Sequence, residues 1–490
     1  MKRLHILWSL FGLSALAGLE HRAWAGEPAV EITRGPYLQA LLSRSVSIAW
    51  LTPRAAECSV RLEEVGAPAP LEALSPRRTN HLVKFEGLAP GDLHRYEILD
   101  ADGQPVPGGG PFEFRTAPDD GGSFRFVALG DSGTGSSKQH EIGEALCALL
   151  PGPELFIHTG DLVYSGDADT AIFAPYKCLL SRTCFYPARG NHDVGLDWGN
   201  LFFPPIEDEG ETVTNYSFDW GPAHFVTVDT GSATFGPRSP KIAWLEKDLE
   251  TARTAGAIWI ILYTHLPVYS AGIYGNLAES TLAPVADKFQ VDLVLSGHDH
   301  NYQRSHPVRE RMARDMWQNP DYVSPRGTIY VVTGGGGAGL YPGGARDPIR
   351  TFVSEFHAVD VQVTPERISV KARGCANGSI CLGDDGILDA FTITKGSASR
   401  RLLWFRRGDM NFNGVVNLTD AVTLLEHLFR GRNLQCPMVG DCDLSGNLDV
   451  ADPITILRHL FLGGPALPHP YPDCGEAAVE DDELCMECAG

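Results

Sequence analysis

The stretch Phe124–Gly133, FRFVALGDSG, decides the fold expected for the centre of this chain. Its first six residues are apolar except for Arg125, and the run stops at Gly130 and Asp131. A short apolar run that ends in a glycine and an acid is typical of a buried strand followed by a tight loop. We therefore expect a buried β-strand over Phe124–Leu129, with Asp131 in the loop at its carboxyl end.

Five further apolar runs of the same kind follow along the chain. They are Leu155–His158, Phe225–Val228, Ile258–Leu262, Val291–Leu295 and Ile329–Val332. Lys138–Leu150 and Ser239–Ala255, which lie between some of them, have the pattern of helices. Residues 123–395 are therefore predicted to form a layered α/β or α+β core. Open sheets of this kind bind ligands at the carboxyl ends of their strands.

Five short polar motifs occur in order at such positions. They are Gly130-Asp131-Ser132-Gly133, Gly160-Asp161-Leu162-Val163-Tyr164, Gly190-Asn191-His192-Asp193, Tyr263-Thr264-His265 and Gly297-His298-Asp299-His300. Each motif alone is weak, because a buried Asp after a strand often only caps backbone amides. As a set they supply two Asp, one Asn and three His to one crevice. Those oxygen and nitrogen donors suffice for two metal ions that share a carboxylate.

The ordered motifs resemble those of calcineurin-like metallophosphoesterases. The tyrosine three residues after Asp161, Tyr164, makes this motif resemble that of the purple acid phosphatases within this family. The resemblance covers roughly residues 30–395 and implies a four-layer α/β (α+β) sandwich around two metal ions. It implies a ferric ion held by Asp131, Tyr164 and His300, a divalent ion (Zn²⁺, Mn²⁺ or Fe²⁺) held by Asn191, His265 and His298, and Asp161 as the bridge between them.

The resemblance also implies that phosphomonoesters are hydrolysed by a metal-activated hydroxide. His192 is not needed as a ligand, so it is the candidate general acid or phosphate clamp. Its alternative role is a hydrogen bond that orients Asn191 or the bridging carboxylate. Where many relatives have a second substrate-facing His, this chain has Ile273-Tyr274-Gly275-Asn276, so Tyr274 is a candidate phosphate donor. Gly334–Gly337 lacks the Lys-Ser/Thr of a P-loop, and we expect it to be a tight turn.

Residues 27–117 are predicted to form a small β-sandwich. Val46–Trp50 and Glu113–Thr116 alternate like strands, with proline and glycine between them. His81–Glu97 resembles a fibronectin type III module, and Arg34–Gln39 resembles the start of the N-terminal domain of purple acid phosphatases. Nothing in this region has catalytic chemistry, so we expect it to pack against or space its neighbours.

Residues 405–463 contain two calcium-type loops whose first residues are 32 positions apart. In each loop the oxygen-bearing residues have EF-hand spacing, and a glycine at position 6 permits the sharp turn that calcium requires. The candidate ligands are Asp409, Asn411, Asn413, Val415, Asn417 and Asp420 in the first loop and Asp441, Asp443, Ser445, Asn447, Asp449 and Asp452 in the second, with Val415 and Asn447 acting through their carbonyls.

An amphipathic helix is predicted after each loop. Two loop–helix units of this spacing resemble a dockerin type I domain, an α-helical, EF-hand-like module. The resemblance implies bound Ca²⁺ and a cohesin-like partner on a scaffold or cell surface. A calcium-stabilised cap or an intramolecular contact is the alternative role.

The amino terminus has the pattern of a secretory signal peptide over residues 1–25. Lys2-Arg3 precedes the apolar stretch Ile6–Leu19, and Ala23-Trp24-Ala25 forms a cleavage site, so cleavage is expected near Ala25. The apolar stretch is too short for a membrane span of about 20 residues. We therefore expect a secreted, periplasmic or cell-surface protein without a membrane span.

The chain has 11 cysteines, and in an exported protein close pairs are first interpreted as disulfides. The odd count leaves at least one thiol free or paired between chains. Residues 464–490 are expected to be an acidic tail held by disulfides. The local pairs predicted are Cys178 with Cys184 and Cys375 with Cys381, with Cys436 and Cys442 as a further candidate pair.

Length and charge restrict the function classes. A chain of 490 residues favours about three domains, and a net charge of −21 argues against a nucleic-acid or anionic-membrane partner. Bound metal ions would reverse the local field and admit a phosphate ester. The sequence thus predicts an exported acid phosphatase. The alternatives are a phosphodiesterase or nucleotidase on the same scaffold, or a surface-display protein that acts through its dockerin-like module.

Overall fold

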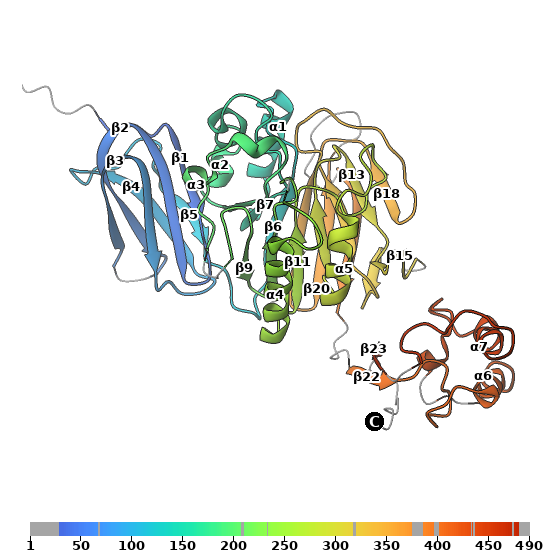
Figure 1. The fold of residues 1–490 in the computed structure, drawn as a ribbon. Helices are drawn as coiled ribbons and strands as arrows, with labels where there is room; N and C mark the ends of the chain where they lie inside the picture. Colours follow the sequence, from blue (N-terminus) through green and yellow to red (C-terminus); the bar gives the residue numbers. More distant parts are fainter. Residues whose placement is uncertain are drawn as a thin grey trace, which may run out of the picture.

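The structure is a computed structural model that describes residues 29–66, 69–206, 210–232, 234–316, 320–374, 386–395, 401–432, 434, 437–472 and 475–479. The predicted signal peptide, residues 473–474 and 480–490 of the predicted tail and the Cys375/Cys381 pair lie outside the described residues. Along the chain, a β-rich N-terminal region is followed by a large central domain and a small helical region (Figure 1). None of the described helices has the length and apolar character needed to cross a membrane.

The N-terminal region is one hydrogen-bonded sheet that bends on itself. Its strands are β1 (Arg34–Gln39), β2 (Ser45–Glu64), β3 (Leu71–Glu86), β4 (Leu93–Asp100) and β5 (Phe112–Arg115). The start of β2 pairs with β1, and its end pairs with β4. Strand β3 pairs with both halves of β2, and the register of that pair shifts between Leu51 and Cys58. Trp50, Val60 and Tyr96 from different parts of this sheet share one core. The region is sheet-rich as predicted, and its likeness to fibronectin type III stays a prediction.

Two seven-stranded sheets form the central domain. The first has the order β16 (Asp321–Val323), β21 (Ile387–Thr394), β20 (Arg367–Arg373), β19 (Ala358–Val363), β6 (Phe124–Leu129), β7 (Leu155–His158) and β8 (Cys184–Pro187). The second has the order β18 (Ile349–Val353), β13 (Tyr302–Ser305), β17 (Ile329–Thr333), β12 (Leu293–Ser296), β11 (Trp259–Tyr263), β10 (Ala223–Thr227) and β9 (Tyr216–Trp220). A short hairpin, β14 (Val308–Arg309) and β15 (Met312–Ala313), lies beside them.

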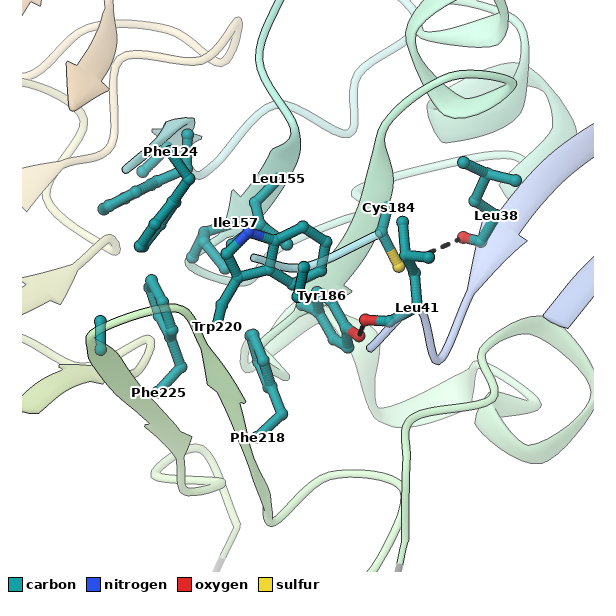
Figure 2. Packing of buried hydrophobic residues seen from close by; sticks show 14 of the residues in the cluster. Leu38, Leu41, Phe124, Leu155, Ile157, Cys184, Tyr186, Phe218, Trp220 and Phe225 are labelled. Atoms are coloured by element: carbon teal, nitrogen blue, oxygen red, sulfur yellow. Dashed lines mark hydrogen bonds between the residues drawn. The ribbon is translucent and has the colours of Figure 1, made fainter. Parts of the chain in front are cut away.

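The alternation of side chains along the strands sorts the apolar residues of these sheets onto two faces. Phe126 of β6 and Phe225 of β10 lie in the core between the sheets, with their rings 5.4 Å apart (Figure 2 shows part of this core). Val127 and Val226, one position further along each strand, belong to separate outer cores. Both faces of each sheet are therefore buried, as the continuous apolar runs of the sequence indicate.

Helices cover the two outer faces. The first sheet is covered by α1 (Ser137–Cys147), α2 (Lys177–Leu180), α3 (Trp198–Leu201) and a π-helical turn (Asp169–Phe173), and the second by α4 (Pro240–Ala255) and α5 (Glu279–Phe289). Ser136 and Ser239 cap α1 and α4 by accepting a hydrogen bond from a backbone N–H of the first turn. The central domain thus has the four α/β/β/α layers that were predicted.

The N-terminal sheet is joined to the central domain through buried contacts. The Tyr186 hydroxyl donates to the Leu41 carbonyl at 2.7 Å, and the Cys184 thiol faces the Leu38 carbonyl at 3.8 Å (Figure 2). Tyr96 donates to the Ser181 carbonyl at 2.8 Å. Apolar residues of both regions form a single buried cluster, so the two regions share one core.

Two predicted disulfides are wrong. Cys178 is bonded to Cys147, because α2 packs on α1 and places these residues 6.2 Å apart at their Cα atoms. Cys184 lies in β8 and faces the N-terminal sheet as a free thiol. Cys442 is also a buried free thiol, so it does not pair with Cys436.

The C-terminal region contains two helices, α6 (Leu418–Arg430) and α7 (Ala451–Phe461), with a 3₁₀ turn (Pro437–Gly440) between them. A two-stranded ladder joins β22 (Arg401–Phe405) to β23 (Gly475–Val479). Leu424 of α6 and Ile456 of α7 meet in a small core. Each helix follows one of the predicted calcium-type loops, and the likeness to a dockerin stays a prediction.

A buried histidine links the second sheet to its covering helix and supplies a test of the packing. Nδ1 of His224 in β10 lies 2.7 Å from Asp219, and Nε2 lies 3.0 Å from Asp248 in α4. Burial opposes protonation of His224, but the hydrogen bonds to the two carboxylates outweigh it and raise its pKa to about 9. The protonated His224 therefore stabilises the folded chain. This stabilisation is complete below the unfolded-state pKa of about 6.5 and is lost as the pH rises through 9.

We expect the substitution His224→Gln to lower the free energy of unfolding by about 1–3 kcal/mol at pH 6, and by much less at pH 10. Denaturant unfolding of both proteins at the two pH values measures the difference. Equal destabilisation at both pH values would show that the charge of His224 does not contribute.

Candidate metal centre

The predicted ligands follow strands of both central sheets at one end of the sandwich. Asp131 follows β6, Asp161 and Tyr164 follow β7, and Asn191 follows β8 in the first sheet. His265 follows β11 and the pair His298 and His300 follows β12 in the second sheet. Because β6 to β8 are parallel, as are β11 and β12, their carboxyl ends lie together and bring these loops into contact.

One group of donor atoms gathers around the Tyr164 hydroxyl. It donates to Oδ1 of Asp131 at 3.1 Å and lies 2.8 Å from Nε2 of His300. Nε2 of His300 is 3.5 Å from the same carboxylate oxygen. Nδ1 of His300 donates to the Gly339 carbonyl at 2.7 Å, which leaves Nε2 available as a ligand atom. Asp131, Tyr164 and His300 are the three residues predicted for the ferric ion.

A second group gathers around Nε2 of His265. This atom lies 2.9 Å from Oδ1 of Asn191, 3.1 Å from Nδ1 of His298 and 3.4 Å from Oδ1 of Asp161. Nδ1 of His265 donates to the Thr159 carbonyl at 3.0 Å, so Nε2 carries the free lone pair. The ligand atoms of Asp161, His265 and His298 all lie within 4.8 Å of one another. These residues are the ones predicted for the divalent ion and the bridge.

The charges of these groups favour a bound cation. Asp131 is 0% exposed and Asp161 is 1% exposed. No lysine or arginine of the described residues forms an ion pair with either carboxylate. Burial lowers the pKa of His298 to about 4, which keeps this imidazole neutral. Burial, followed by the charges of Asp131 and Asp161, raises the pKa of Tyr164, so a phenolate forms here only beside a cation. Two buried carboxylates, an amide oxygen, imidazoles and a phenol fit two cations.

The backbone of the ligand loops is held in an unfavourable conformation. Asp131 and Asp161 have φ of 57° and His298 has φ of 69°, in the left-handed region that costs a non-glycine residue about 1–3 kcal/mol. Close packing holds them there, since a Cβ at Gly190 would lie 2.1 Å from Oδ1 of Asp161. Gly336 approaches the Gly130 carbonyl in the same way, which agrees with the tight turn expected there.

Comparison with known proteins agrees with this geometry. The family model for calcineurin-like phosphoesterases matches residues 124–302, which include all seven predicted ligands. Human "Acid phosphatase type 7" is 26% identical over 384 residues, which are 67% of this chain and 80% of that protein. The central domain is a purple acid phosphatase-like metallophosphoesterase domain.

Two further comparisons define how far this likeness extends. The structure of purple acid phosphatase PPD1 from yellow lupin (Lupinus luteus) seeds has a TM-score of 0.62 at 18% identity and covers 75% of this chain and 74% of its own, which shows a shared fold. The Arabidopsis thaliana protein named "Probable inactive purple acid phosphatase 1" is 26% identical over 273 residues, which are 47% of this chain and 44% of that protein. Activity must therefore be argued from the site.

His192 and Tyr274 lie at the metallophosphoesterase site, as their assignments require. The backbone N–H of His192 donates to Oδ1 of Asp161 at 2.9 Å, so the contact that orients this carboxylate comes from the main chain. The exposed His192 imidazole makes no hydrogen bond with the described residues, and its ring lies 4.6 Å from that of Tyr164. The ring of Tyr274 lies 4.4 Å from that of His298.

Asp193 is a functional residue to which the sequence analysis gave no role. Its buried carboxylate accepts four backbone hydrogen bonds, from Asp161 (3.0 Å), Leu162 (2.8 Å), Val163 (3.1 Å) and Gly190 (2.8 Å). It therefore joins the loop after β7 to the loop after β8, which together supply three predicted ligands. Its place in the Gly190-Asn191-His192-Asp193 motif was the available signal.

Asp299 and Tyr341 were also missed. Asp299 accepts hydrogen bonds from the Ser270 hydroxyl and from the Tyr274 backbone, which places Tyr274 beside the site. The ring of Tyr341 stacks on His300 at a centroid distance of 4.0 Å. Asp299 stands between two predicted ligands in the sequence, whereas nothing around Tyr341 indicated its position.

The two calcium-type loops have matching backbones. Gly414 and Gly446, at position 6 of each loop, both have φ of 84°. The Asp409 carboxylate accepts from the Gly414 N–H at 2.8 Å, and the Asp441 carboxylate accepts from the Gly446 N–H at 3.2 Å.

In each loop the carboxylate of the Asp at position 12 accepts a hydrogen bond from the backbone N–H of the residue at position 9. The Asn417 N–H donates to Asp420 at 2.8 Å, and the Asp449 N–H donates to Asp452 at 2.9 Å. The side chains of Asn411, Asn413, Asp443 and Ser445 accept hydrogen bonds from loop N–H groups, and the carbonyls of Val415 and Asn447 receive side-chain hydrogen bonds.

The second loop has the donor arrangement of a cation site. Asp441, Asp443 and Asp452 offer oxygens within 4.8 Å of one another. Oδ1 of Asp441 is buried without a hydrogen-bond partner. Burial raises the pKa of Asp452 to about 6, which reflects the cost of a charge at this place without a compensating ion.

We expect Asp193→Asn to lower the melting temperature and the metal content together. The amide nitrogen cannot accept from backbone donors, so buried N–H groups lose their partner at a cost of about 2–4 kcal/mol. Calorimetry and elemental analysis of the purified protein measure both effects. Asp197→Asn, at an exposed position of the same segment, is the control. Wild-type stability and metal content in Asp193→Asn would show that this carboxylate does not hold the loops.

Proposed function

We propose that this protein is an exported acid phosphatase that hydrolyses phosphomonoesters at its metallophosphoesterase site. The observation that carries the proposal is the convergence of seven oxygen and nitrogen donors into two adjoining groups. Both carboxylates are buried, and neither pairs with a lysine or an arginine among the described residues. In this proposal Asp131, Tyr164 and His300 hold Fe³⁺. Asn191, His265 and His298 hold a divalent ion (Zn²⁺, Mn²⁺ or Fe²⁺), and Asp161 is shared by both ions. Two such ions supply Lewis acidity toward the phosphate and lower the pKa of a water molecule.

Side chains of the protein would orient the ligands, donate a proton and contact the substrate. His265 and His300 each donate their Nδ1 proton to a backbone carbonyl, which fixes their tautomers and directs Nε2 toward the site. His192, exposed above Tyr164, is placed to donate a proton to the leaving oxygen of the ester. Tyr274, beside His298, is placed to contact the phosphate or the group attached to it.

Two other functions compete with this proposal. A phosphodiesterase or nucleotidase would use the same metal scaffold and would differ in the group accepted around it. A surface-display protein with an idle site is disfavoured, because an idle site has no reason to keep seven matched donors and strained loops around them. Export rests on the predicted signal peptide.

Purified full-length protein should hydrolyse phosphomonoesters and contain two metal ions. We expect His192→Ala to lower kcat on an alkyl phosphate by about 10²–10³-fold and on 4-nitrophenyl phosphate only a few-fold, since a good leaving group needs no proton. Metal content should stay at the wild-type level. His140→Ala, at an exposed histidine of α1, is the matched control.

Three outcomes contradict this assignment. Preference for diesters or nucleotides would favour the competing enzymes, and a wild type that hydrolyses no ester would favour the surface-display function. Loss of metal from the His192→Ala variant would show that this residue supports the ligands.

We further propose that the C-terminal region binds Ca²⁺ and docks the protein on a cohesin-like partner. Exposed apolar side chains recur on both helical units 32 positions apart, as the pairs Leu418 and Val450, Val422 and Ile454, and Phe429 and Phe461. Phe429 and Phe461 are at least 64% exposed, which is unusual for phenylalanine and favours a protein partner. The buried Asp441 oxygen without a partner supports the calcium site.

Calcium should stabilise this region without altering catalysis. Its loops gather carboxylates that repel one another without a cation, so metal binding contributes folding free energy. In the full chain we expect calcium to protect residues 405–463 from limited proteolysis, and Asp441→Ala to weaken this protection. Ester hydrolysis should change little when calcium is removed with a selective chelator. Equal proteolysis with and without calcium would contradict the calcium site.

A further inference from the structure

The mouth of the candidate metal centre is formed by aromatic rings that touch the ligands themselves. Tyr274 leans on His298 at a centroid distance of 4.4 Å, and Tyr341 stacks on His300 at 4.0 Å with an interplanar angle of 11°. The rings of Tyr274 and Tyr341 meet edge to face at 5.8 Å. Aromatic surface therefore begins directly at the ligand cluster, where the first atoms beyond a bound phosphate would lie.

Exposed apolar side chains lie close in sequence to Tyr274 and His192. Tyr274 is 47% exposed and its neighbour Ile273 is 55% exposed. On the loop after β8, Val194 follows His192 in a 3₁₀ turn and is 64% exposed. Apolar surface beside a polar cluster is the usual composition of a small-molecule site, and it becomes buried when the ligand binds.

The aromatic surface is held in place before any substrate arrives. Asp299 accepts hydrogen bonds from the Ser270 hydroxyl and the Tyr274 N–H, and Gly272 packs so closely that a Cβ there would lie 2.5 Å from the Asp299 carboxylate. Tyr341 donates its N–H to the His300 carbonyl at 3.0 Å and accepts from Ser354 at 2.9 Å. A preorganised surface loses little conformational entropy on binding, so contacts with it contribute fully to affinity.

The charges at the mouth restrict what the ester can carry. In the described part of the chain, no lysine or arginine makes a hydrogen bond or ion pair with the predicted ligands, His192, Tyr274 or Tyr341. None of these residues therefore holds a lysine or an arginine in place for a second phosphate or a carboxylate on the substrate. Tyr274 and Tyr341 contact the ligand histidines themselves, so they favour a ring joined directly to the ester oxygen over one placed a sugar away.

Building on the proposed phosphatase function, we infer that this site prefers phosphate monoesters of aromatic alcohols, and that Tyr274 is the residue that sets the preference. The aromatic group of the substrate lies against the exposed surface of Tyr274. Stacking and burial of apolar area contribute to binding the aryl ester, whereas a small polar alkyl ester gains neither.

Two non-hydrolysable probes test this inference on the metal-loaded full chain. Phenylphosphonate and methylphosphonate share the phosphonate group and differ in the ring. We expect the wild type to bind phenylphosphonate at least about 10-fold more tightly, as measured by titration calorimetry. Tyr274→Ala should reduce this ratio to about 2-fold or less, and Tyr274→Phe, which keeps the ring, should preserve it.

The same variants are then compared on 1-naphthyl phosphate and glycerol 2-phosphate. The ratio of kcat/KM for the two esters should fall about 10-fold in Tyr274→Ala and stay within about 2-fold of the wild-type value in Tyr274→Phe. Within each variant the ratio cancels differences in metal loading. Inhibition by inorganic phosphate reports whether the ligand cluster is intact.

The possible failures are distinguishable. Hydrolysis of neither ester by the wild type would overturn the proposed function. Hydrolysis of both esters with equal binding of the two phosphonates, or with a ratio that Tyr274→Ala does not change, would overturn the aryl preference and leave the phosphatase function intact.

Discussion

Two buried carboxylates, Asp131 and Asp161, impose the constraint on which the rest of the site depends. The chain has a net charge of −21, and none of its described lysines or arginines pairs with either group. A buried carboxylate without a counter-charge costs several kcal/mol, so burial of these side chains favours a compensating cation. Burial and, to a smaller extent, these two charges raise the pKa of Tyr164. Ionisation of its phenol therefore also needs a nearby cation.

The fold concentrates these charges because two parallel sets of strands end at one place. Loops from the first sheet bring carboxylates, the phenol and the amide, and loops from the second bring the imidazoles. Left-handed φ angles at Asp131, Asp161 and His298 show that the loops are held against their own preference. Asp193, which accepts four backbone N–H groups, supplies much of the restraint on the first sheet's side. Stability is thus sacrificed locally to place the donors.

The regions on either side of the central domain relate to it differently. The N-terminal sheet shares its core, through contacts such as Tyr186 with Leu41 and Tyr96 with Ser181, so it acts as part of the scaffold. The C-terminal helices have a core of their own around Leu424 and Ile456 and expose apolar residues outward. This arrangement suits the docking role proposed for the C-terminal region.

The sequence alone determined much of this. All six apolar runs predicted as strands of the central domain are strands within two residues at each end, because a run buried on both faces leaves a strong local pattern. Six of the seven ligand candidates stand in short polar motifs beside a glycine or another polar residue, whereas Tyr164 was assigned through the resemblance to purple acid phosphatases. The paired loop–helix units were visible because a 32-residue repeat needs no tertiary information.

Tertiary structure alone decided the contacts between distant segments. It paired Cys147 with Cys178 in place of Cys184, because α1 and α2 pack together while β8 faces the N-terminal sheet. It set the distances within the two ligand groups that the resemblance implied, and it brought Tyr341 onto His300. Proximity of this kind arises when loops from two sheets converge, and a local sequence pattern does not record it. The contact between the rings of Tyr274 and Tyr341 therefore emerged only from the folded chain.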